Sequence, residues 1–224
     1  MVERTQPQDE RWAAVDRYIG EHLLGDNATL DAALAANAAG GLPDIDVSPA
    51  QGRMLHLLAR MAGARRILEV GTLGGYSTIE LARALPDSGE LVTLEIDPHH
   101  ADVARANVAA AGLSDRVEVI TGPALDSFAT LTGPFDFVFI DADKENNAGY
   151  VREAIRLSRP GTTIVVDNVI REGGVLDADS ADPRIQGTRA LFDMVAAEPR
   201  LTATAVQTVG VKKWDGFLLA VVTG

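Results

Sequence analysis

The sequence contains no cysteine and no long apolar run. With 0 Cys among 224 residues, disulfide bonds and thiolate metal sites are both excluded. Although 46% of the residues are hydrophobic, no uninterrupted apolar stretch approaches the roughly 18 residues that a membrane span needs. The first residues, MVERTQPQDERW, are polar and acidic, whereas a signal peptide would be basic and then apolar. These absences predict a soluble, cytoplasmic globular protein without a membrane partner.

Basic residues are also scarce. The chain has 20 Lys and Arg against 32 Asp and Glu, which gives a formal net charge of -12. Such a chain repels a phosphate backbone unless its basic residues are gathered on one face. The densest basic clusters are only the pairs Arg65-Arg66 and Lys212-Lys213. Nucleic acid is therefore not expected as a partner.

The length and the absence of repeats or linkers predict a single domain over residues 1–224. Its first 45 residues or so form a helical segment. One amphipathic helix is indicated by apolar residues at helical spacing, closed by a glycine, at Trp12, Val15, Ile19, Leu23 and Gly25. A second, alanine-rich helix is expected over 29–39. We expect this segment to contribute to a substrate site or to a dimer contact.

The stretch SPAQGRMLHLLARMAG predicts a third helix. Ser48 is suited to be its N-cap, Pro49 occupies the first helical position, and Gln51 is placed to complete a capping box. The helix should therefore begin at Pro49.

From Arg66 onward, short apolar runs alternate with segments of helix length. The runs are ILEV, LVTLEI, VEVIT, FDFVFI and TIVVDN. This alternation predicts an α/β fold, with a parallel sheet covered by helices on both faces. The end of the chain differs, because TATAVQTV and GFLLAVV are joined by the short GVKKWDG and predict an antiparallel pair.

Ligands of such folds bind outside the carboxyl ends of the strands. Acidic, amide or glycine residues gather at these ends, whereas ordinary surface loops would show no such bias. The set is Glu69, Gly71, Glu95, Asp97, Thr121, Gly122, Asp141, Asp167 and Asn168.

The loop EVGTLGGYS predicts a nucleoside site. Its glycines allow a sharp turn and the close approach of a ligand, but their spacing departs from the dinucleotide fingerprint G-x-G-x-x-G. Glu95 ends the next strand, where a carboxylate can accept both ribose hydroxyls. Glu69 is a poor neighbour for a pyrophosphate and a good one for a cation. A nucleoside with a positively charged tail fits best, which points to S-adenosylmethionine.

The motifs ILEVGTLGGYST, LEID, GPALD, FIDADK and VVDN together resemble the caffeoyl-CoA and catechol O-methyltransferase family of class I S-adenosylmethionine-dependent enzymes, bacterial type. The resemblance runs from VSPAQG to DGFLLA. It implies a Rossmann-like methyltransferase fold, with a seven-stranded mostly parallel sheet and an antiparallel last strand. It also implies cofactor-binding residues: Val47, Glu69, Gly71, Thr72 and Ser77 around the methionine portion and ribose, Glu95 at the ribose hydroxyls, Ala124 beside the adenine, and Asp141.

Asp141, Asp167 and Asn168 offer two carboxylates and one amide oxygen from neighbouring strand ends. Oxygen ligands without Cys or His suit Mg²⁺, Mn²⁺ or Ca²⁺ and argue against zinc. An isolated Asp-Asn pair would more simply cap a turn. The family, however, uses such a set as a metal site that leaves room for two vicinal hydroxyls of a substrate.

Lys144 follows three residues after Asp141 and can be a general base. A divalent cation acidifies a coordinated hydroxyl, and Lys144 would take the proton. The alternative is a surface lysine on the following helix; the resemblance favours the catalytic role of Lys144 beside Asp141. Asp143 either orients Lys144 or lines the cofactor pocket.

The expected reaction is metal-dependent methylation of a catechol-like small molecule, or of a hydroxycinnamoyl-type one, by a homodimer. The alternatives are a tRNA-modifying methyltransferase and a non-catalytic nucleoside-binding module. Substrate choice should lie in the N-terminal segment and in REGGVLDADSADPRI, where Arg171 either pairs with a substrate carboxylate or is solvated. Aromatic residues that could contact a substrate ring, if they do not pack in the core or in a dimer, are Trp12, Tyr18 and Trp214.

Overall fold

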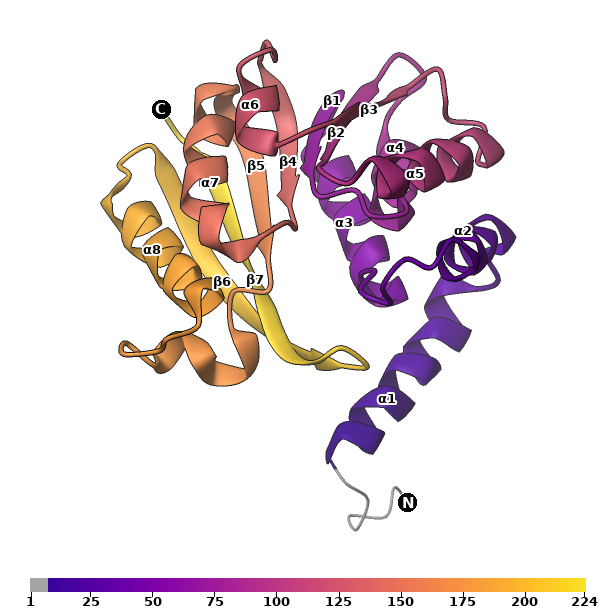
Figure 1. Cartoon of the computed structure of the whole chain (residues 1–224), viewed down its shortest axis with the longest axis horizontal. Helices are drawn as coiled ribbons and strands as arrows, with labels where there is room; N and C mark the ends of the chain where they lie inside the picture. The colour runs from indigo at the N-terminus through magenta and orange to yellow at the C-terminus, as the bar shows by residue number, and fades with distance from the viewer. Residues whose placement is uncertain (1–7) are drawn as a thin grey trace.

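The computed structural model describes residues 8–224 and contains one sheet (Figure 1). Its seven strands lie in the order β3-β2-β1-β4-β5-β7-β6. The first five are parallel, and β7 lies antiparallel between β5 and β6. Both the parallel sheet and the antiparallel terminal pair were predicted correctly. The strands are β1 (Arg66–Val70), β2 (Glu90–Glu95), β3 (Val117–Thr121), β4 (Phe135–Ile140), β5 (Ser158–Asp167), β6 (Leu201–Gly210) and β7 (Lys213–Val222).

Helices cover both faces of the sheet, as Figure 1 shows. One layer holds α3 (Pro49–Met61), α4 (Tyr76–Ala84) and α5 (Pro98–Ala110), and the other holds α6 (Ala124–Phe128), α7 (Asn147–Arg156) and α8 (Pro183–Ala197). Within residues 8–224, none of the helices combines the length and the apolar character that a membrane crossing requires.

The central strand β4 shows why both layers are needed. All six residues of FDFVFI are buried. Val138 and Ile140 pack in the core under α7 and α8, whereas Phe137 and Phe139 pack in the core under α3 and α4. A strand that is buried on both faces reads as a continuous apolar run, because neither side meets water. Each fully buried phenylalanine contributes roughly 1.5–3 kcal/mol.

The N-terminal segment forms the predicted helices, but the apolar residues of its first helix stay outside the core, whereas Leu30 and Ala33 of the second are buried in it. Helix α1 (Gln8–Ile19) continues into a π-helical turn, η1 (Gly20–Leu24), and α2 (Ala28–Ala39) follows. The chain ends η1 at Gly25, whose φ of 64° is left-handed. None of the residues in α1 is buried, and Val15 and Leu23 are 56% and 74% exposed. The amphipathic pattern therefore predicted the helix without predicting a partner for its apolar side.

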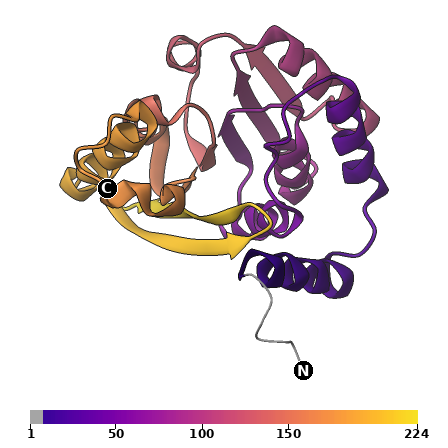
Figure 2. The same ribbon diagram turned by 60° about the horizontal axis from the view of Figure 1, so that its bottom comes forward.

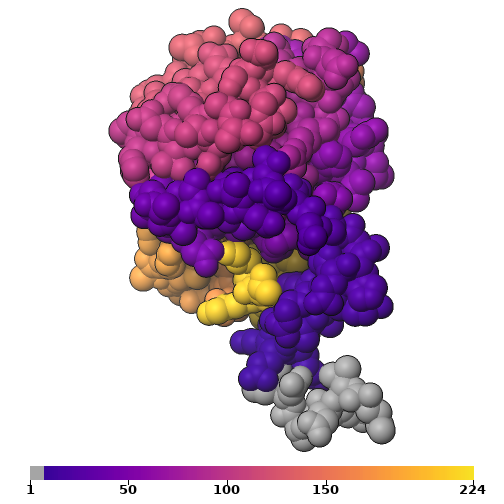
Figure 3. Space-filling view, turned by 90° about the vertical axis from the view of Figure 1, so that its right-hand side faces the viewer, coloured from indigo at the N-terminus to yellow at the C-terminus, as the bar shows by residue number. Residues whose placement is uncertain are grey.

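The β6–β7 hairpin reaches α1 at the other end of the sequence. Its strands pair up to Gly210 and Lys213, which leaves a two-residue turn. The Asp16 carboxylate accepts a hydrogen bond of 2.7 Å from the backbone N–H of Val211 in this turn. Figures 2 and 3 show the hairpin beside the N-terminal segment. The N-terminal segment and this turn therefore meet beyond the carboxyl end of β5, because β7 runs past Asp167 toward the turn.

The start of α3 corrects one prediction. Ser48 is the N-cap, Pro49 follows it, and the Ser48 hydroxyl accepts from the backbone N–H of Gln51 at 3.3 Å. The capping box is not completed, however, because the Gln51 side chain donates instead to Asp167, 2.6 Å away and 116 residues later. A hydrogen bond to a buried carboxylate is stronger than one to a backbone group near solvent.

Candidate active site

The candidate site lies where the order of the strands reverses, between β1 and β4. Ligands of open α/β sheets bind at such a switch point. Gly71 leaves β1 with a φ of 96°, and a Cβ added to it would lie 2.0 Å from the carbonyl oxygen of Asp141. Only glycine therefore allows the loop after β1 to lie against the loop after β4. The backbone N–H of Asp141 in turn donates to the Val70 carbonyl at 2.8 Å.

Glu69 lies beneath this loop and is fully buried. Its carboxylate accepts hydrogen bonds from the hydroxyls of Ser77 at 2.6 Å and Thr93 at 2.7 Å, and from that of Thr78. Burial raises the pKa of Glu69 to about 7, although these hydroxyls partly oppose the shift. Glu69 thus holds the first turn of α4 against the sheet, while contacts of Glu69 and Ser77 with a cofactor remain predictions.

Glu95 shapes the same loop from the end of β2. One carboxylate oxygen accepts from the backbone N–H groups of Thr72 at 3.1 Å and Leu73 at 2.8 Å, and the other accepts from Asp97 at 2.9 Å. A carboxylate has about four acceptor positions. Glu95 thus ties the glycine loop to the end of β2, while its contact with the ribose hydroxyls stays a prediction.

The other predicted cofactor residues lie along this edge of the sheet. Val47 directly precedes the N-cap of α3 and is 9% exposed. The Thr72 hydroxyl bonds with that of Thr93 at 2.6 Å. Ala124 opens α6 directly after β3. Because β3, β2 and β1 are neighbours, Ala124, Glu95 and the glycine loop follow one another along the edge.

Two asparagines that the sequence did not single out support the glycine loop from behind. The Asn107 amide donates at 2.9 Å to both the Gly74 carbonyl and the Asn37 side-chain oxygen. A Cβ on Gly74 would lie 1.8 Å from that same oxygen. Asn37 could have been noticed as a lone amide within the alanine-rich ALAANAAG, but Asn107 gives no local signal.

The predicted metal ligands follow β4 and β5. The pairing of Ile140 with Val166 puts Asp141 beside Asp167. Asp167 is 4% exposed, and burial, followed by the charge of Asp141, raises its pKa to about 7. Asn168 has a left-handed φ of 58°, and its backbone N–H donates to Asp167 at 2.8 Å.

This donor set fits a hard divalent cation. Two neighbouring carboxylates, one of them buried, repel each other, and a cation between them would relieve the repulsion. In residues 8–224 no three His, Cys, Asp or Glu side chains gather in a cluster that could hold a metal. A cation held here would therefore need the amide oxygen of Asn168 as a third ligand, and oxygen donors of these kinds suit Mg²⁺ or Mn²⁺.

Lys144 lies next to the metal ligands and is 6% exposed. Its ammonium group donates to Asp141 at 2.6 Å. The alternative of a surface lysine is therefore wrong, because a buried cation needs the partner that Asp141 supplies. Asp143 accepts from the hydroxyl of Tyr150 and the amide of Asn146 instead, so it fixes the turn into α7.

The segment after Asn168 turns sharply at η3 (Arg171–Leu176). The Asp215 carboxylate accepts from the backbone N–H groups of Ile170 and Arg171, each at 3.0 Å. A Cβ on Gly173 would lie 3.1 Å from the Trp214 ring, so the ring covers this turn. The hairpin thus fixes the segment in which we expect substrate choice.

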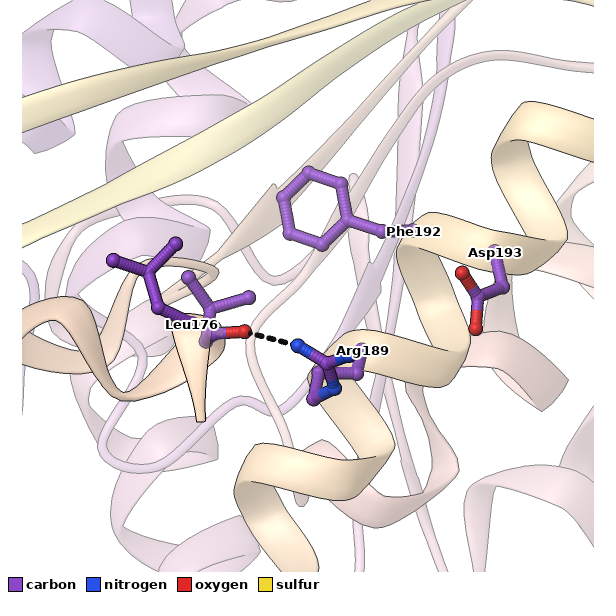
Figure 4. A pocket seen from close by; sticks show the side chains of 5 residues that line it. Leu176, Arg189, Phe192 and Asp193 are labelled. Atoms are coloured by element: carbon purple, nitrogen blue, oxygen red, sulfur yellow. Dashed lines mark hydrogen bonds between the residues drawn. The ribbon is translucent and has the colours of Figure 1, made fainter. Parts of the chain in front are cut away.

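A separate hollow of about 300 Å³ lies between η3 and α8 (Figure 4). The Arg189 guanidinium closes one side by donating to the Val175 carbonyl at 2.7 Å. The hollow is lined by Val175, Leu176, Arg189, Phe192 and Asp193. None of these is a predicted catalytic, cofactor or metal residue, although Val175 and Leu176 belong to the segment in which we expect substrate choice.

Comparison with protein families gives one match that covers most of the chain. A family model described as O-methyltransferase matches residues 25–221. A curated relative from Mycobacterium tuberculosis, named catechol O-methyltransferase, is 57% identical over 209 residues, which are 93% of this chain and 94% of the relative.

Solved structures agree with that match. An O-methyltransferase from Bacillus cereus, in complex with S-adenosylhomocysteine, has a TM-score of 0.94 and 56% identity; the match covers 96% of this chain and 99% of the other. The O-methyltransferase TomG from Streptomyces achromogenes, in complex with S-adenosylmethionine, has a TM-score of 0.95 and 48% identity, over 98% and 100%. The chain is thus similar to methyltransferases over nearly its whole length.

The buried Glu69 predicts a pH dependence of stability. Its pKa is raised from 4.5 to about 7 on folding, so the folded state binds the proton more strongly than the unfolded state. The stabilisation is complete below the unfolded pKa and is lost as the pH rises through about 7. Urea unfolding in EDTA should show a loss of up to about 1.4 kcal/mol per pH unit in this window that Glu69→Gln lacks.

Asp167 has a raised pKa as well. Its contribution to the change of stability with pH is therefore present in both the wild type and Glu69→Gln. Glu118→Gln, at an exposed position of β3, should behave as the wild type. Parallel curves for the wild type and Glu69→Gln would show that Glu69 does not change its proton affinity on folding.

Proposed function

Because the chain belongs to the O-methyltransferase family and is an S-adenosylmethionine-dependent O-methyltransferase, we propose that it methylates a catechol-like substrate with the help of a divalent cation. The observation that carries this proposal is the group formed by Asp141, Asp167 and Lys144 at adjacent strand ends. The relative named catechol O-methyltransferase supports the substrate class. Two vicinal hydroxyls are the substrate group that suits a cation with open coordination positions.

In this proposal the residues at the two strand ends divide the work between holding the cation and accepting a proton. Asp141, Asp167 and the Asn168 amide would hold the cation, and Mg²⁺, Mn²⁺ or Ca²⁺ suits these oxygens. When bound, such a cation lowers the pKa of a coordinated hydroxyl and favours the neutral form of a neighbouring lysine. Lys144 then accepts the phenolic proton at Nζ. The methyl group moves from the sulfonium sulfur to the phenolate oxygen, which leaves S-adenosylhomocysteine and the methyl ether.

The glycine loop predicted to bind the cofactor aligns the methyl donor and takes no part in proton transfer. The glycine loop is fixed by Glu95, Asn37 and Asn107, and it touches the metal side at Gly71. A methyl donor bound there would lie beside the metal ligands, with Asp141 as the residue predicted to serve both sides. In-line transfer depends on this fixed relation between the two halves, because misplacement by 1 Å costs on the order of 100-fold in rate.

Lys144→Met should slow methyl transfer by about 100-fold or more and spare cofactor binding, because it removes a proton acceptor. The assay is single-turnover methylation of a catechol panel with mass detection, beside calorimetric titration of S-adenosylhomocysteine. Lys213→Met, on an exposed side chain of the hairpin, is the matched control and should keep full activity. Near-normal turnover of Lys144→Met at neutral pH would rule out the base assignment.

Removal of the metal by a chelator should affect methyl transfer without affecting cofactor binding. EDTA is expected to abolish transfer while the dissociation constant of S-adenosylhomocysteine changes by less than about threefold, and added Mg²⁺ should restore activity. Asp167→Ala should reproduce the chelated state, because it removes one of only two charged ligands. Asp87→Ala, on a fully exposed side chain before β2, should match the wild type.

Full activity in EDTA would leave a metal-independent methyltransferase. Loss of both cofactor binding and activity would mean that the acidic residues support the fold or the cofactor pocket instead.

We further propose that the chain forms a homodimer through the N-terminal segment. Val15, Tyr18 and Leu23 are all more than half exposed in the single chain. Light scattering should give twice the mass of the chain for the wild type. The double variant Val15→Glu, Tyr18→Glu should give a lower mass, because charge on an apolar contact opposes association; a monomeric wild type would contradict the proposal.

A further inference from the structure

We infer that Gln51 is a positioning residue that orients the Asp167 carboxylate toward the cation; this inference rests on the proposed function. Gln51 lies in the first turn of α3, far from β5 in sequence. Its amide nitrogen lies 2.6 Å from one oxygen of Asp167, across 116 residues of chain. Neither the sequence pattern nor the family resemblance assigned a role to this side chain beyond a helix cap.

The two oxygens of Asp167 receive one neutral donor each. Gln51 donates to one oxygen, and the backbone N–H of Asn168 donates to the other at 2.8 Å. Donors on opposite oxygens fix the rotation of the carboxylate plane, while further acceptor positions stay free on both oxygens. Ligating carboxylates in metal sites are themselves hydrogen-bonded in this way, which orients them before the metal binds.

A neutral donor also preserves the charge of the site. Asp141 and Asp167 carry two negative charges and Lys144 one positive charge, so the group has a net charge of about -1 when all three are ionised. A lysine or arginine in place of Gln51 would cancel this charge. A glutamate there would add repulsion 2.6 Å from Asp167. The amide is the side chain that restrains the ligand without competing for the cation.

Gln51 is itself held firmly at its base. Its backbone N–H donates a hydrogen bond to the hydroxyl of the N-cap residue Ser48. The next residue, Gly52, is buried, and a Cβ there would lie 3.1 Å from the Tyr76 ring at the start of α4. The first turn of α3 is thus clamped against the helix that follows the glycine loop. Movement of Gln51 would require movement of this whole packing contact, so Asp167 has a rigid partner.

The test is Mn²⁺ binding to the full chain, followed by electron paramagnetic resonance of the free ion. Gln51→Met keeps the length of the side chain and removes the donor. It should raise the dissociation constant of Mn²⁺ by 10- to 100-fold, the usual effect of losing a partner of a ligand. Binding of S-adenosylhomocysteine should change by less than about threefold. In methylation assays, saturating Mn²⁺ should restore most of the maximal rate.

Arg60→Met is the matched control, because Arg60 is exposed near the end of the same helix. It should leave Mn²⁺ affinity unchanged. Gln51→Asn, one methylene shorter, should fall out of reach of Asp167 and weaken Mn²⁺ binding as Gln51→Met does. This second variant keeps the test decisive where Gln51→Met does not fold.

Unchanged Mn²⁺ affinity in either Gln51 variant would overturn the inference and leave the metal-dependent reaction standing. A lower melting temperature in EDTA together with wild-type Mn²⁺ affinity would mean that Gln51 only supports the fold, which also overturns it. Failure of the wild type to bind Mn²⁺ would overturn the proposed metal site and the role of Gln51 together.

Discussion

The site depends on one backbone contact, between Gly71 and Asp141. A side chain at Gly71 would lie 2.0 Å from the Asp141 carbonyl oxygen, and the Asp141 N–H is bonded to β1 at Val70. The loop predicted to hold the cofactor and the loop that carries the predicted metal ligand Asp141 are therefore one rigid unit. Methyl transfer requires a donor and an acceptor held in line, and this contact fixes their separation before either ligand binds.

Buried carboxylates are treated differently at the two ends of the sheet. At the carboxyl ends of the strands, Glu69, Glu95 and Asp167 accept only from hydroxyls, backbone N–H groups or an amide. At the opposite end, Asp136 also accepts two bonds from the Arg159 guanidinium. Burial alone would raise the pKa of Asp136, but the Arg65 and Arg66 N–H groups and Arg159 lower it. The protein thus pairs Asp136 with a guanidinium, whereas Glu69, Glu95 and Asp167 receive hydrogen bonds from neutral donors.

The strands and helix caps could be read from the sequence because they depend on local patterns. The run FDFVFI, apolar except for Asp136, indicates a strand buried on both faces, and Ser48 caps its helix as expected. The acidic strand ends were found for the same reason, since strand register carries Asp141 next to Asp167. The gathering of the proposed metal ligands therefore followed from topology.

Contacts across long sequence distances were missed or misjudged. Gln51 resembles a capping residue locally, yet its side chain donates a hydrogen bond to the buried carboxylate of Asp167, 116 residues away. Glu95 was expected at the ribose hydroxyls, which stays a prediction, but the sequence did not show that the backbone N–H groups of Thr72 and Leu73 also donate to its carboxylate. A local sequence pattern does not show how many acceptor positions of a carboxylate will be used by hydrogen bonds in the folded protein. Sequence therefore predicts which residues meet at the site more readily than which of their atoms remain free.

Helix α1 and the tip of the β6–β7 hairpin are held to their neighbours far more weakly than the strand ends are held to one another. At the tip of the β6–β7 hairpin, Asp16 bonds one backbone N–H, and Lys212 pairs with an almost fully exposed Asp44 at 3.2 Å. Exposed pairs of this kind contribute at most about 1 kcal/mol. Separating the strand ends would instead break sheet hydrogen bonds and expose the apolar core around Phe139. Separating α1 from the tip of the hairpin would therefore cost less than separating the strand ends, and it would leave the contact between Gly71 and Asp141 undisturbed.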